Sequence, residues 1–151
     1  MDSTPEYGPN LTPPPDRAAW NPAILAVIAL LLNFLPASIF HALNYGRLGA
    51  PQLTKPRLIQ YCLVGLIMFM SILALELYPN AGPIGYAPLI VNAVFAFHFY
   101  KSQASLYEKH IAAGGKKASL LAPLCVSLAY VLAILGFVFL VDQGAARFLN
   151  K

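Results

Sequence analysis

Two histidines in long apolar stretches could ligate a cofactor. His41 stands in "SIFHALNYGRLG", and His98 stands in "AFHFYK" between Phe97 and Phe99. Imidazole nitrogens on facing helices are the usual axial ligands of a b-type haem, so the pair raises the hypothesis of a haem, quinone or proton-handling site. Bulky neighbours leave little room for a haem, however, and an amphipathic ring is also stable where a helix leaves a membrane. We therefore expect no cofactor and a structural role for both histidines, with haem b as the open alternative.

Three polar side chains inside apolar stretches are further candidates. Asn33 and Asn92 lie near the middle of their stretches, where an amide without a hydrogen bond is costly. Asn33, His41 and Asn44 share one helical stripe, because steps of three and four residues return to the same face. We expect this stripe to face protein and the amides to form interhelical hydrogen bonds, with a polar lining for a small ligand as the alternative. Glu76 could carry a proton or an ion, but it stands near a helix end without a partner acid.

The sequence lacks the motifs of common enzyme chemistries. "AAGGKKAS" fails the spacing of a phosphate-binding loop, because a second lysine stands where serine or threonine is needed. No G-x-S-x-G motif, metal-ligand spacing or pair of carboxylates occurs, so acyl transfer, metal-dependent hydrolysis and glycoside cleavage lack their minimal parts. Cys62 and Cys125 have no CxxC spacing, and we expect them to be buried, inert thiols. We therefore predict a protein that is not an enzyme and holds no metal.

The composition indicates the environment in which these residues lie. Of the 151 residues, 58% are apolar and 11% are charged, and the mean hydropathy is +0.63. A soluble domain has roughly a quarter of its residues charged. Four blocks without charge, each near the length of about 20 residues that a helix needs to cross a bilayer, are 24–40, 58–75, 84–100 and 120–141. The sequence thus predicts an all-α integral membrane protein with four transmembrane helices, arranged as two antiparallel hairpins.

Helix signals set the expected boundaries. Within a transmembrane domain over 21–142, the expected spans are about 22–45, 57–78, 84–101 and 119–141. A disordered, proline-rich acidic tail over 1–20 precedes them, and a short tail over 143–151 follows. Pro36 predicts a kink in the first span, and Gly46 is a candidate left-handed terminator. The spacing after His98 favours a third helix that continues beyond the membrane until Gly114 and Gly115 stop it.

Lysine and arginine counts predict the orientation. In the four-span arrangement, the side that carries both termini has Arg17, Arg147 and Lys151. The opposite side has the loops between spans one and two and between spans three and four, with Arg47, Lys55, Arg57, Lys101, Lys109, Lys116 and Lys117. Because basic loops stay in the cytoplasm, we expect both loops there and both termini extracytoplasmic, in a bacterial inner membrane.

Two segments resemble a pattern of small, uncharacterised multi-span bacterial membrane proteins. "LNYGRLGAPQ" follows the first span with an N-Y-x-x-L-G segment, and "KHIAAGGKKAS" precedes the last span with H-x3-G-G-x3-S. The resemblance implies an interaction surface at the cytoplasmic face, and Arg47 is expected at the lipid phosphates. The residues that carry it are Asn44, Tyr45, Leu48, Gly49, Gln103, His110, Gly114, Gly115 and Ser119.

A role through partners fits these expectations best. Four spans and short loops leave almost no soluble domain. The sequence also lacks a basic patch interleaved with aromatic residues, which would indicate nucleic-acid binding. We expect a non-enzymatic accessory or interaction protein that lies in the lipid bilayer and binds another integral membrane protein, or itself as a homo-oligomer. Two alternatives stay open. One is an immunity or exclusion protein against a membrane-acting toxin, and the other is a haem, quinone or proton-handling subunit that uses His41 and His98.

Overall fold

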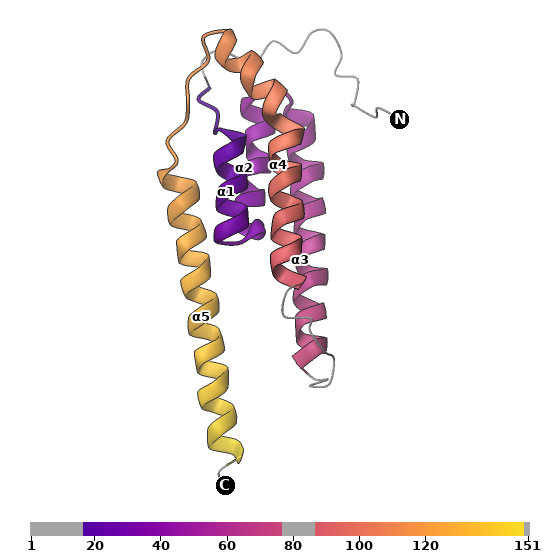
Figure 1. Ribbon diagram of the computed structural model, residues 1–151, viewed down its shortest axis with the longest axis vertical. Helices are drawn as coiled ribbons and strands as arrows, with labels where there is room; N and C mark the ends of the chain where they lie inside the picture. Colours follow the sequence, from indigo (N-terminus) through magenta and orange to yellow (C-terminus); the bar gives the residue numbers. More distant parts are fainter. Residues whose placement is uncertain (1–16, 77–86, 150–151) are drawn as a thin grey trace.

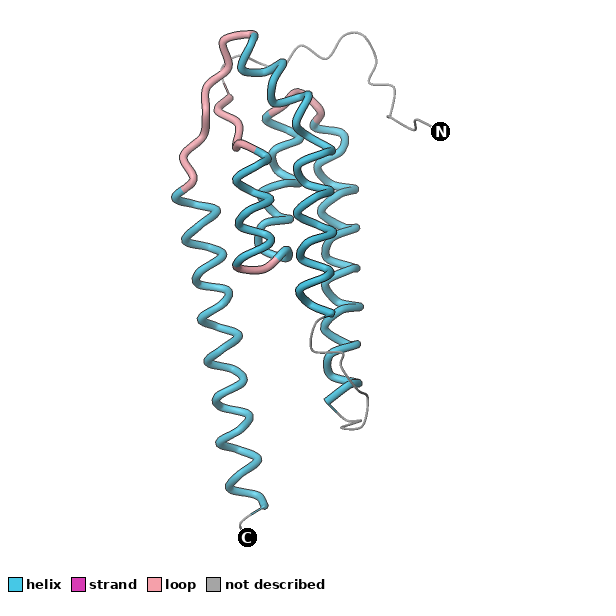
Figure 2. Tube along the Cα trace, viewed as in Figure 1, coloured by secondary structure: helices cyan, strands magenta, loops and turns pink. Residues whose placement is uncertain are grey.

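The computed structural model describes residues 17–76 and 87–149, and regular structure in this part of the chain is helical apart from one isolated bridge. The elements are α1 (Pro22–Leu31), α2 (Phe34–Arg47), the 3₁₀ helix η1 (Pro51–Leu53), α3 (Thr54–Glu76), α4 (Ala87–Ala112) and α5 (Leu121–Leu149). The first four α-helices lie side by side, and α5 runs past them on one flank (Figures 1 and 2). The predicted all-α class is confirmed.

The first span, expected over 22–45, is two helices instead of one. The chain turns at Leu32 and Asn33, and α2 begins directly afterwards. Pro36 explains the position of the turn, because in a continuous helix it would remove the donor for the Leu32 carbonyl and clash with that carbonyl. In α2, Pro36 falls in the first turn, where a missing N–H is harmless. The expected kink at Pro36 is therefore replaced by a complete break at Asn33.

α1 and α2 form an antiparallel hairpin. The backbone N–H of Trp20 donates to Asn44 Oδ1 over 2.8 Å, and Asn44 Nδ2 donates to the Trp20 carbonyl over 2.9 Å. The rings of Trp20 and Phe40 meet edge to face with their centroids 5.1 Å apart. In Figure 1, α2 returns beside α1 toward the end of the molecule from which α1 starts. The hairpin therefore brings the chain back to its starting end.

The described part of the N-terminal segment lies at the same end as both basic loops. The Ala19 N–H donates to the Lys116 carbonyl over 2.9 Å, and the Ala118 N–H donates to the Ala19 carbonyl over 2.8 Å. The expected separation of the N-terminal segment from the basic loops is therefore wrong for residues 17–20. That expectation placed a full span between them, whereas the hairpin turns back.

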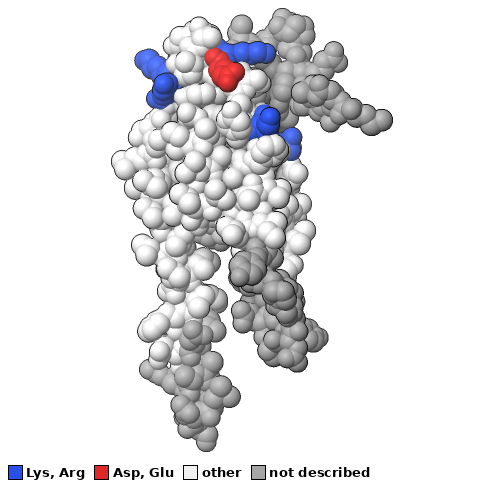
Figure 3. Space-filling view, viewed as in Figure 1, with Lys and Arg blue, Asp and Glu red and all other residues white. Residues whose placement is uncertain are grey.

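Basic residues concentrate at this end, which is formed by residues 17–20, 47–57 and 101–118 and which we call the basic end. It holds eight of the ten lysines and arginines, and the other two are Arg147 and Lys151. In Figure 3 the Lys and Arg side chains seen on this face gather at the same end. Residues 1–16, with most of the expected acidic tail, and residues 77–86 lie outside the described part of the chain.

Asparagine side chains hold the turn of the hairpin. Asn33 Oδ1 accepts from the N–H of Leu35 over 2.9 Å, and Asn92 Oδ1 of α4 accepts from the N–H of Phe34 over 3.1 Å. The first N–H groups of a helix have no partner within that helix, so these side chains satisfy two of them. Asn92 thus forms the expected interhelical hydrogen bond, and Asn33 is the N-cap of α2.

Two glycines end α2 and α4 in the same way. Gly49 and Gly114 have φ angles of 87° and 82°, and the residue after each donates its N–H to the carbonyl five residues before it, over 2.8 and 2.9 Å. Such a left-handed cap favours glycine, because a Cβ is strained there. Gly114 stops α4 as expected. α2, however, ends at Arg47, and its left-handed terminator is Gly49 rather than Gly46.

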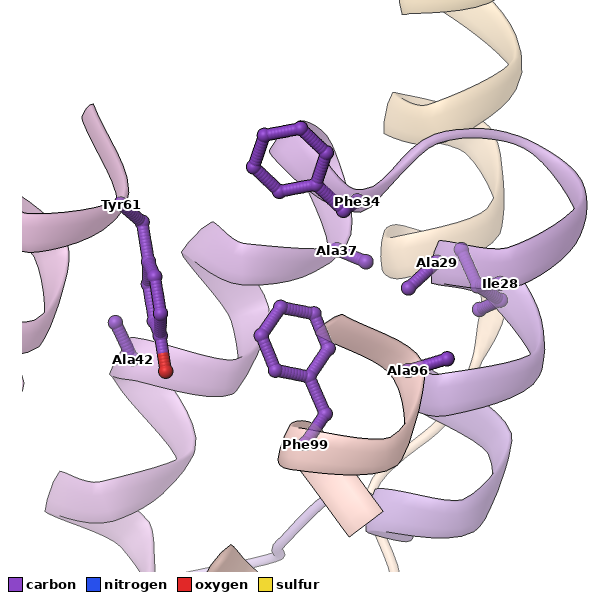
Figure 4. Close-up of a cluster of buried hydrophobic side chains, with 8 residues drawn as sticks. All are labelled: Ile28, Ala29, Phe34, Ala37, Ala42, Tyr61, Ala96 and Phe99. Atoms are coloured by element: carbon purple, nitrogen blue, oxygen red, sulfur yellow. The ribbon is translucent and has the colours of Figure 1, made fainter. Parts of the chain in front are cut away.

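The core between α1, α2, α3 and α4 combines aromatic and small side chains. Phe34, Tyr61 and Phe99 come from three different helices and belong to one buried cluster (Figure 4). The small members of this cluster are Ala29, Ala37, Ala42 and Ala96. Phe34 also stacks on Phe95 with ring centroids 4.4 Å apart. Alanines on facing helices let the backbones approach closely, so the hairpin packs closely against α4, and Tyr61 of α3 joins the same cluster.

α5 packs on the rest of the molecule only near its beginning. Its contacts are with α1 and α2, and Pro123 and Ser127 are its buried residues among the side chains described. The helix from Leu132 to Leu140 is exposed throughout, with these two leucines 68% and 69% exposed. α5 also continues to Leu149, so most of the short tail expected over 143–151 is helical instead.

Two helical stretches are long and apolar enough to cross a membrane, Pro51–Ser71 and Leu121–Leu140. α1, at 10 residues, is about 15 Å long and is too short to cross a hydrocarbon core of about 30 Å. The helix expected over 57–78 corresponds to α3, and the one expected over 84–101 corresponds to the first part of α4.

Candidate functional site

Asn44 is the centre of a buried hydrogen-bond network at the basic end. Besides its two bonds with the Trp20 backbone, its Nδ2 donates to Gln103 Oε1 of α4 over 2.9 Å. Gln103 Nε2 donates in turn to the His41 carbonyl over 2.7 Å. Asn44, Gln103 and His41 are fully buried. The network therefore ties the N-terminal segment, α2 and α4 together, and each member depends on the others for its partners.

A second set of bonds links His41 to α3 and α4. The Tyr61 hydroxyl lies 2.9 Å from His41 Nδ1 and 3.3 Å from His98 Nε2. On the other side of the ring, His41 Nε2 lies 3.0 Å from Ser102 Oγ. Each of these groups can both donate and accept, so His98, Tyr61, His41 and Ser102 form one continuous series of hydrogen bonds, which we call the histidine chain.

The histidine chain restricts where its protons lie. Tyr61 has one hydroxyl proton, so it donates to one imidazole and accepts from the other. If it donates to His41 Nδ1, the opposite nitrogen carries a proton and donates to Ser102; if it donates to His98, every bond reverses. Both arrangements leave all four groups neutral, which suits apolar surroundings such as the Phe99 ring stacked 4.3 Å from His41. The same positions of the heavy atoms thus permit two opposite directions of hydrogen-bond donation along the histidine chain.

Neither ring nitrogen of His41 is free to ligate a haem iron. Both ring nitrogens have hydrogen-bond partners, and the ring centroids of His41 and His98 lie 5.9 Å apart. An iron held by both rings would have to displace the Tyr61 hydroxyl, which lies within hydrogen-bonding distance of both. His41 and His98 are thus close together, but the Tyr61 hydroxyl lies between them where a haem would need open space.

Arg47 covers Trp20 at the basic end. Its Nη1 donates to the Ala18 carbonyl over 2.8 Å, and its guanidinium carbon lies 3.8 Å from the centroid of the Trp20 ring. Burial, and then the positive charge of Arg17, lower the pKa of Arg47 from its ordinary value, although an arginine stays charged in a protein. The indole N–H of Trp20 donates to the Ser119 carbonyl over 2.9 Å. These contacts join the end of α2, through Arg47, to the N-terminal segment, and Trp20 joins that segment to Ser119.

The turn between α4 and α5 contains a close contact of His110 with Gly115. A Cβ on Gly115 would collide with the His110 ring, so glycine is the residue that fits. His110 Nε2 lies 3.3 Å from the Lys116 carbonyl, and its Nδ1 is buried without a partner among the described residues. Ser119 Oγ accepts from the N–H of Leu121 over 3.2 Å at the start of α5. These residues shape the turn from which α5 departs.

Half of the ten residues proposed for the interaction surface lie inside the protein. The buried ones are Asn44, Tyr45, Leu48, Gln103 and His110. Gly114 and Ser119 are exposed, and Arg47 is half-buried. The two matching segments do meet, because Ile111 packs against the buried cluster that contains Tyr45 and Leu48. They form an internal contact at the basic end, and little of their surface is open to a partner.

Two buried tyrosines at the basic end differ in their hydrogen bonds. Tyr61 shares its hydroxyl with two histidines, whereas the hydroxyl of Tyr45, a fully buried side chain, has no partner among the described residues. The Tyr107 hydroxyl is in the same situation as that of Tyr45, and burial raises the pKa of Tyr107. Removing the hydroxyl of Tyr61 therefore breaks hydrogen bonds, whereas removing that of Tyr45 breaks none among the described residues.

Sequence reasoning did not single out Tyr61, Ser102 or Trp20 as members of the network. Tyr61 was visible as a polar group within a charge-free block. No spacing along the chain, however, links position 61 to positions 41 and 98, because these residues come from three helices. Their meeting depends on how α2, α3 and α4 pack.

Three other candidates lie elsewhere. Cys62 and Cys125 are exposed on α3 and α5, so the expectation of buried thiols is wrong. The reason is that both helices are covered on one side only. Glu76 is the last residue of α3, and its side chain lies outside the described residues. Within 17–76 and 87–149, no group of three or more His, Cys, Asp or Glu side chains could hold a metal ion.

No protein-family model, curated protein or solved structure matches this chain. Its function is therefore argued from its own residues.

Proposed function

We propose that this chain is an integral membrane protein with three crossing helices and one half-depth hairpin, and that it acts as a non-enzymatic accessory protein of another membrane protein. α3, α4 and α5 cross the bilayer. The α1–α2 hairpin enters from the basic end and returns to it, since α1 reaches only about half of the hydrocarbon thickness. Three crossings replace the four expected because the first apolar block folds back on itself.

Exposed apolar side chains on α3 and α5 support the membrane embedding. A soluble protein rarely leaves contiguous apolar surface of this extent in water, whereas lipid covers it. The turn of the hairpin supports its half-depth position. Backbone N–H groups in hydrocarbon need partners from within the protein, and Asn33 and Asn92 supply them there.

The basic end faces the cytoplasm of a bacterial inner membrane in this proposal. Because the hairpin returns, eight basic residues stand at one end against two near the C-terminus. This asymmetry is larger than the seven to three of a four-span arrangement, and it favours the same location for both basic loops. The N-terminal segment therefore joins the loops in the cytoplasm, and the C-terminus lies on the opposite side.

α5 carries the accessory role. Beyond Ser127 it has no buried side chain among those described, so this part of the helix stands apart from its own bundle. Such a helix can pack in the membrane against a helix of another protein or of a second copy. By contrast, hydrogen bonds join the buried side chains of Asn44, Gln103 and His41 to one another, to Tyr61 and to the backbone, which suits a role in holding the fold.

A photoreactive amino acid on α5 tests the accessory role. We expect a probe at Leu135 to crosslink in cells to a discrete protein, or to a second copy, identified by mass spectrometry. A matched probe at Ile67 on α3 is expected to give lipid adducts, and the two sites are similarly exposed, at 60% and 64%. Lipid adducts alone at both positions would contradict the accessory role.

The histidine chain favours proton handling as a second candidate function. Its ends, His98 and Ser102, are both partly exposed on α4, so a proton taken up at one end could leave at the other. Replacing Tyr61 with Phe interrupts the chain. Proton handling predicts that the proton flux of reconstituted vesicles falls in this variant, whereas the accessory role predicts lower stability without a change in flux.

Two further hypotheses stay predictions. A haem or quinone subunit predicts a cofactor spectrum, and a purified protein without a Soret band after expression with haem precursor would remove the haem version. An immunity or exclusion protein predicts that cells with the gene survive a membrane-acting toxin that kills cells without it.

A further inference from the structure

Three segments that are distant in the sequence bring positive charges together at the basic end. Ala19 bonds to the backbone of Lys116 and Ala118, and Arg47 donates to the carbonyl of Ala18. The basic residues held around this short stretch are Arg17, Arg47, Lys116 and Lys117, which we call the cation cluster.

The cation cluster consists of four basic side chains, and among the described residues no acid is paired with them. Arg47 contacts two neutral groups, the Ala18 carbonyl and the Trp20 ring, and Arg17 is close enough to add to the effect of burial in lowering the pKa of Arg47. Among the side chains that the structure describes, Glu108 is the only acid. Like charges held together repel one another, so an anion bound among them would relieve that repulsion.

Arg47 is suited to hold such an anion. The Trp20 ring covers one face of its guanidinium, and the Ala18 carbonyl accepts from one nitrogen, which leaves the other N–H groups outside that bond. A guanidinium that is already fixed loses less entropy on binding, and its forked donors match the oxygens of a phosphate.

Apolar side chains begin directly beside the cation cluster. α5 starts at Leu121, shortly after Lys117, and Leu121 and Leu124 are 67% and 42% exposed. Val27 of α1, a helix that α5 contacts, is also exposed. A molecule with a phosphate at one end and hydrocarbon at the other therefore matches this surface better than a free phosphate does.

We propose that the cation cluster binds the phosphate of an anionic phospholipid whose acyl chains lie along the beginning of α5. This inference rests on the proposed membrane embedding and adds a preferred lipid class to it. Each positive charge beside an anionic headgroup strengthens binding about fivefold. Lys55 and Lys101 belong to the basic end but not to the cluster, so they contribute less.

Trp20 provides the readout, because it is the single tryptophan of the chain and lies against Arg47. The full-length protein is placed in phosphatidylcholine nanodiscs that contain a trace of pyrene-labelled phosphatidylglycerol or, in the companion sample, pyrene-labelled phosphatidylcholine. We expect more efficient energy transfer from Trp20 to the anionic lipid. This preference is expected to shrink as salt is added.

Two double variants separate the cluster from the general charge of the basic end. Lys116→Gln with Lys117→Gln acts at exposed positions, so the fold is expected to stay intact, as circular dichroism checks. The preference for phosphatidylglycerol should fall about fivefold for each lysine removed. The matched control, Lys55→Gln with Lys101→Gln, removes the same charge and should keep most of the preference.

The outcomes that overturn the inference are distinct. Equal transfer to both lipids in the unaltered protein would contradict it, and so would an equal loss in the two double variants. Complete displacement of the labelled lipid by millimolar inorganic phosphate would assign the cluster to free phosphate instead. A protein that never enters the nanodiscs would contradict the membrane embedding, which is a different result from entry without lipid preference.

Discussion

At the scale of single residues, hydrogen bonds between buried side chains connect the helices of the basic end. His41 contributes its carbonyl to Gln103 and both ring nitrogens to hydroxyl groups, and Asn44 bonds to Trp20 and Gln103. A buried group that loses its partner costs more than an average hydrogen bond contributes. The effect of a substitution here should therefore depend on the bonds that the side chain makes, more than on its size.

The tyrosines at 61 and 45 test this dependence, because the same atom is removed from two buried rings. Tyr61→Phe leaves two imidazoles without their common partner, and we expect it to lower the free energy of unfolding by about 1–3 kcal/mol. Tyr45→Phe removes a hydroxyl that has no partner among the described residues, and we expect no loss or a small gain. Denaturant unfolding in mild detergent measures both. Equal destabilisation by the two changes would contradict the histidine chain.

Part of the site could be predicted from the sequence. Helical spacing placed Asn33, His41 and Asn44 on one stripe facing protein. His41 and Asn44 are fully buried, whereas Asn33 lies in the turn before α2 and is half-buried. The partners could not be predicted in this way, because Tyr61, His98 and Gln103 lie on other helices. Spacing along one helix gives the buried face but not the residue that meets it.

At the scale of elements, the α1–α2 hairpin is the feature that decides how the rest is arranged. A turn inside an apolar block exposes backbone groups that the chain must satisfy with its own side chains. Asn92 does so from a different helix, so it links the position of the turn to α4.

Replacing Asn92 by Leu should therefore weaken the hairpin. The change keeps a similar volume but leaves the Phe34 N–H without its acceptor, and we expect a loss of about 1–3 kcal/mol in the free energy of unfolding. The control is Val94→Leu, on an exposed part of the same helix, which should change little. Thermal unfolding followed by circular dichroism compares them. An Asn92→Leu protein as stable as the unaltered one would refute the capping role.

The glycine caps give a second test at this scale. Gly49→Ala forces a Cβ onto a residue with φ of 87°, and we expect a cost of about 1 kcal/mol. Gly136→Ala lies within α5, where an added Cβ meets nothing within 4 Å, so it should be neutral or stabilising. The melting temperature should thus fall for Gly49→Ala and stay the same or rise for Gly136→Ala. A Gly49→Ala protein that melts at the unaltered temperature would contradict the left-handed cap.

Elements with regular apolar runs were predictable, and the broken one was not. α3 and α4 appear where charge-free blocks and the glycine stop placed them. The first block is likewise apolar and free of charged residues, so hydropathy alone does not reveal its turn. Asn33 followed by Pro36 carried the signal, because an asparagine three residues before a proline suits an N-cap better than a helix interior.

At the scale of the whole molecule, one turn changes the end of the molecule at which residues 17–20 lie. The orientation expected from the sequence assumed that each apolar block crosses the membrane once, so it placed Arg17 opposite Arg47. Arg47 instead donates to the carbonyl of Ala18, the residue next to Arg17. A count of basic residues gives an orientation only after the number of crossings is known.

Single-cysteine labelling tests most directly the central claim that the α1–α2 hairpin enters the membrane and returns to the same side. With Cys62 and Cys125 replaced by Ala, the variants Arg17→Cys, Gln52→Cys and Gln143→Cys are each treated with a membrane-impermeant maleimide. We expect Arg17→Cys and Gln52→Cys to be labelled in inside-out vesicles and Gln143→Cys in spheroplasts. The reason is that the α1–α2 hairpin enters and leaves the membrane on one side, so the flanking residues 17 and 52 lie on the same side. Labelling of Arg17→Cys from the side opposite to Gln52→Cys would show that the first block crosses the membrane, and it would contradict the half-depth hairpin.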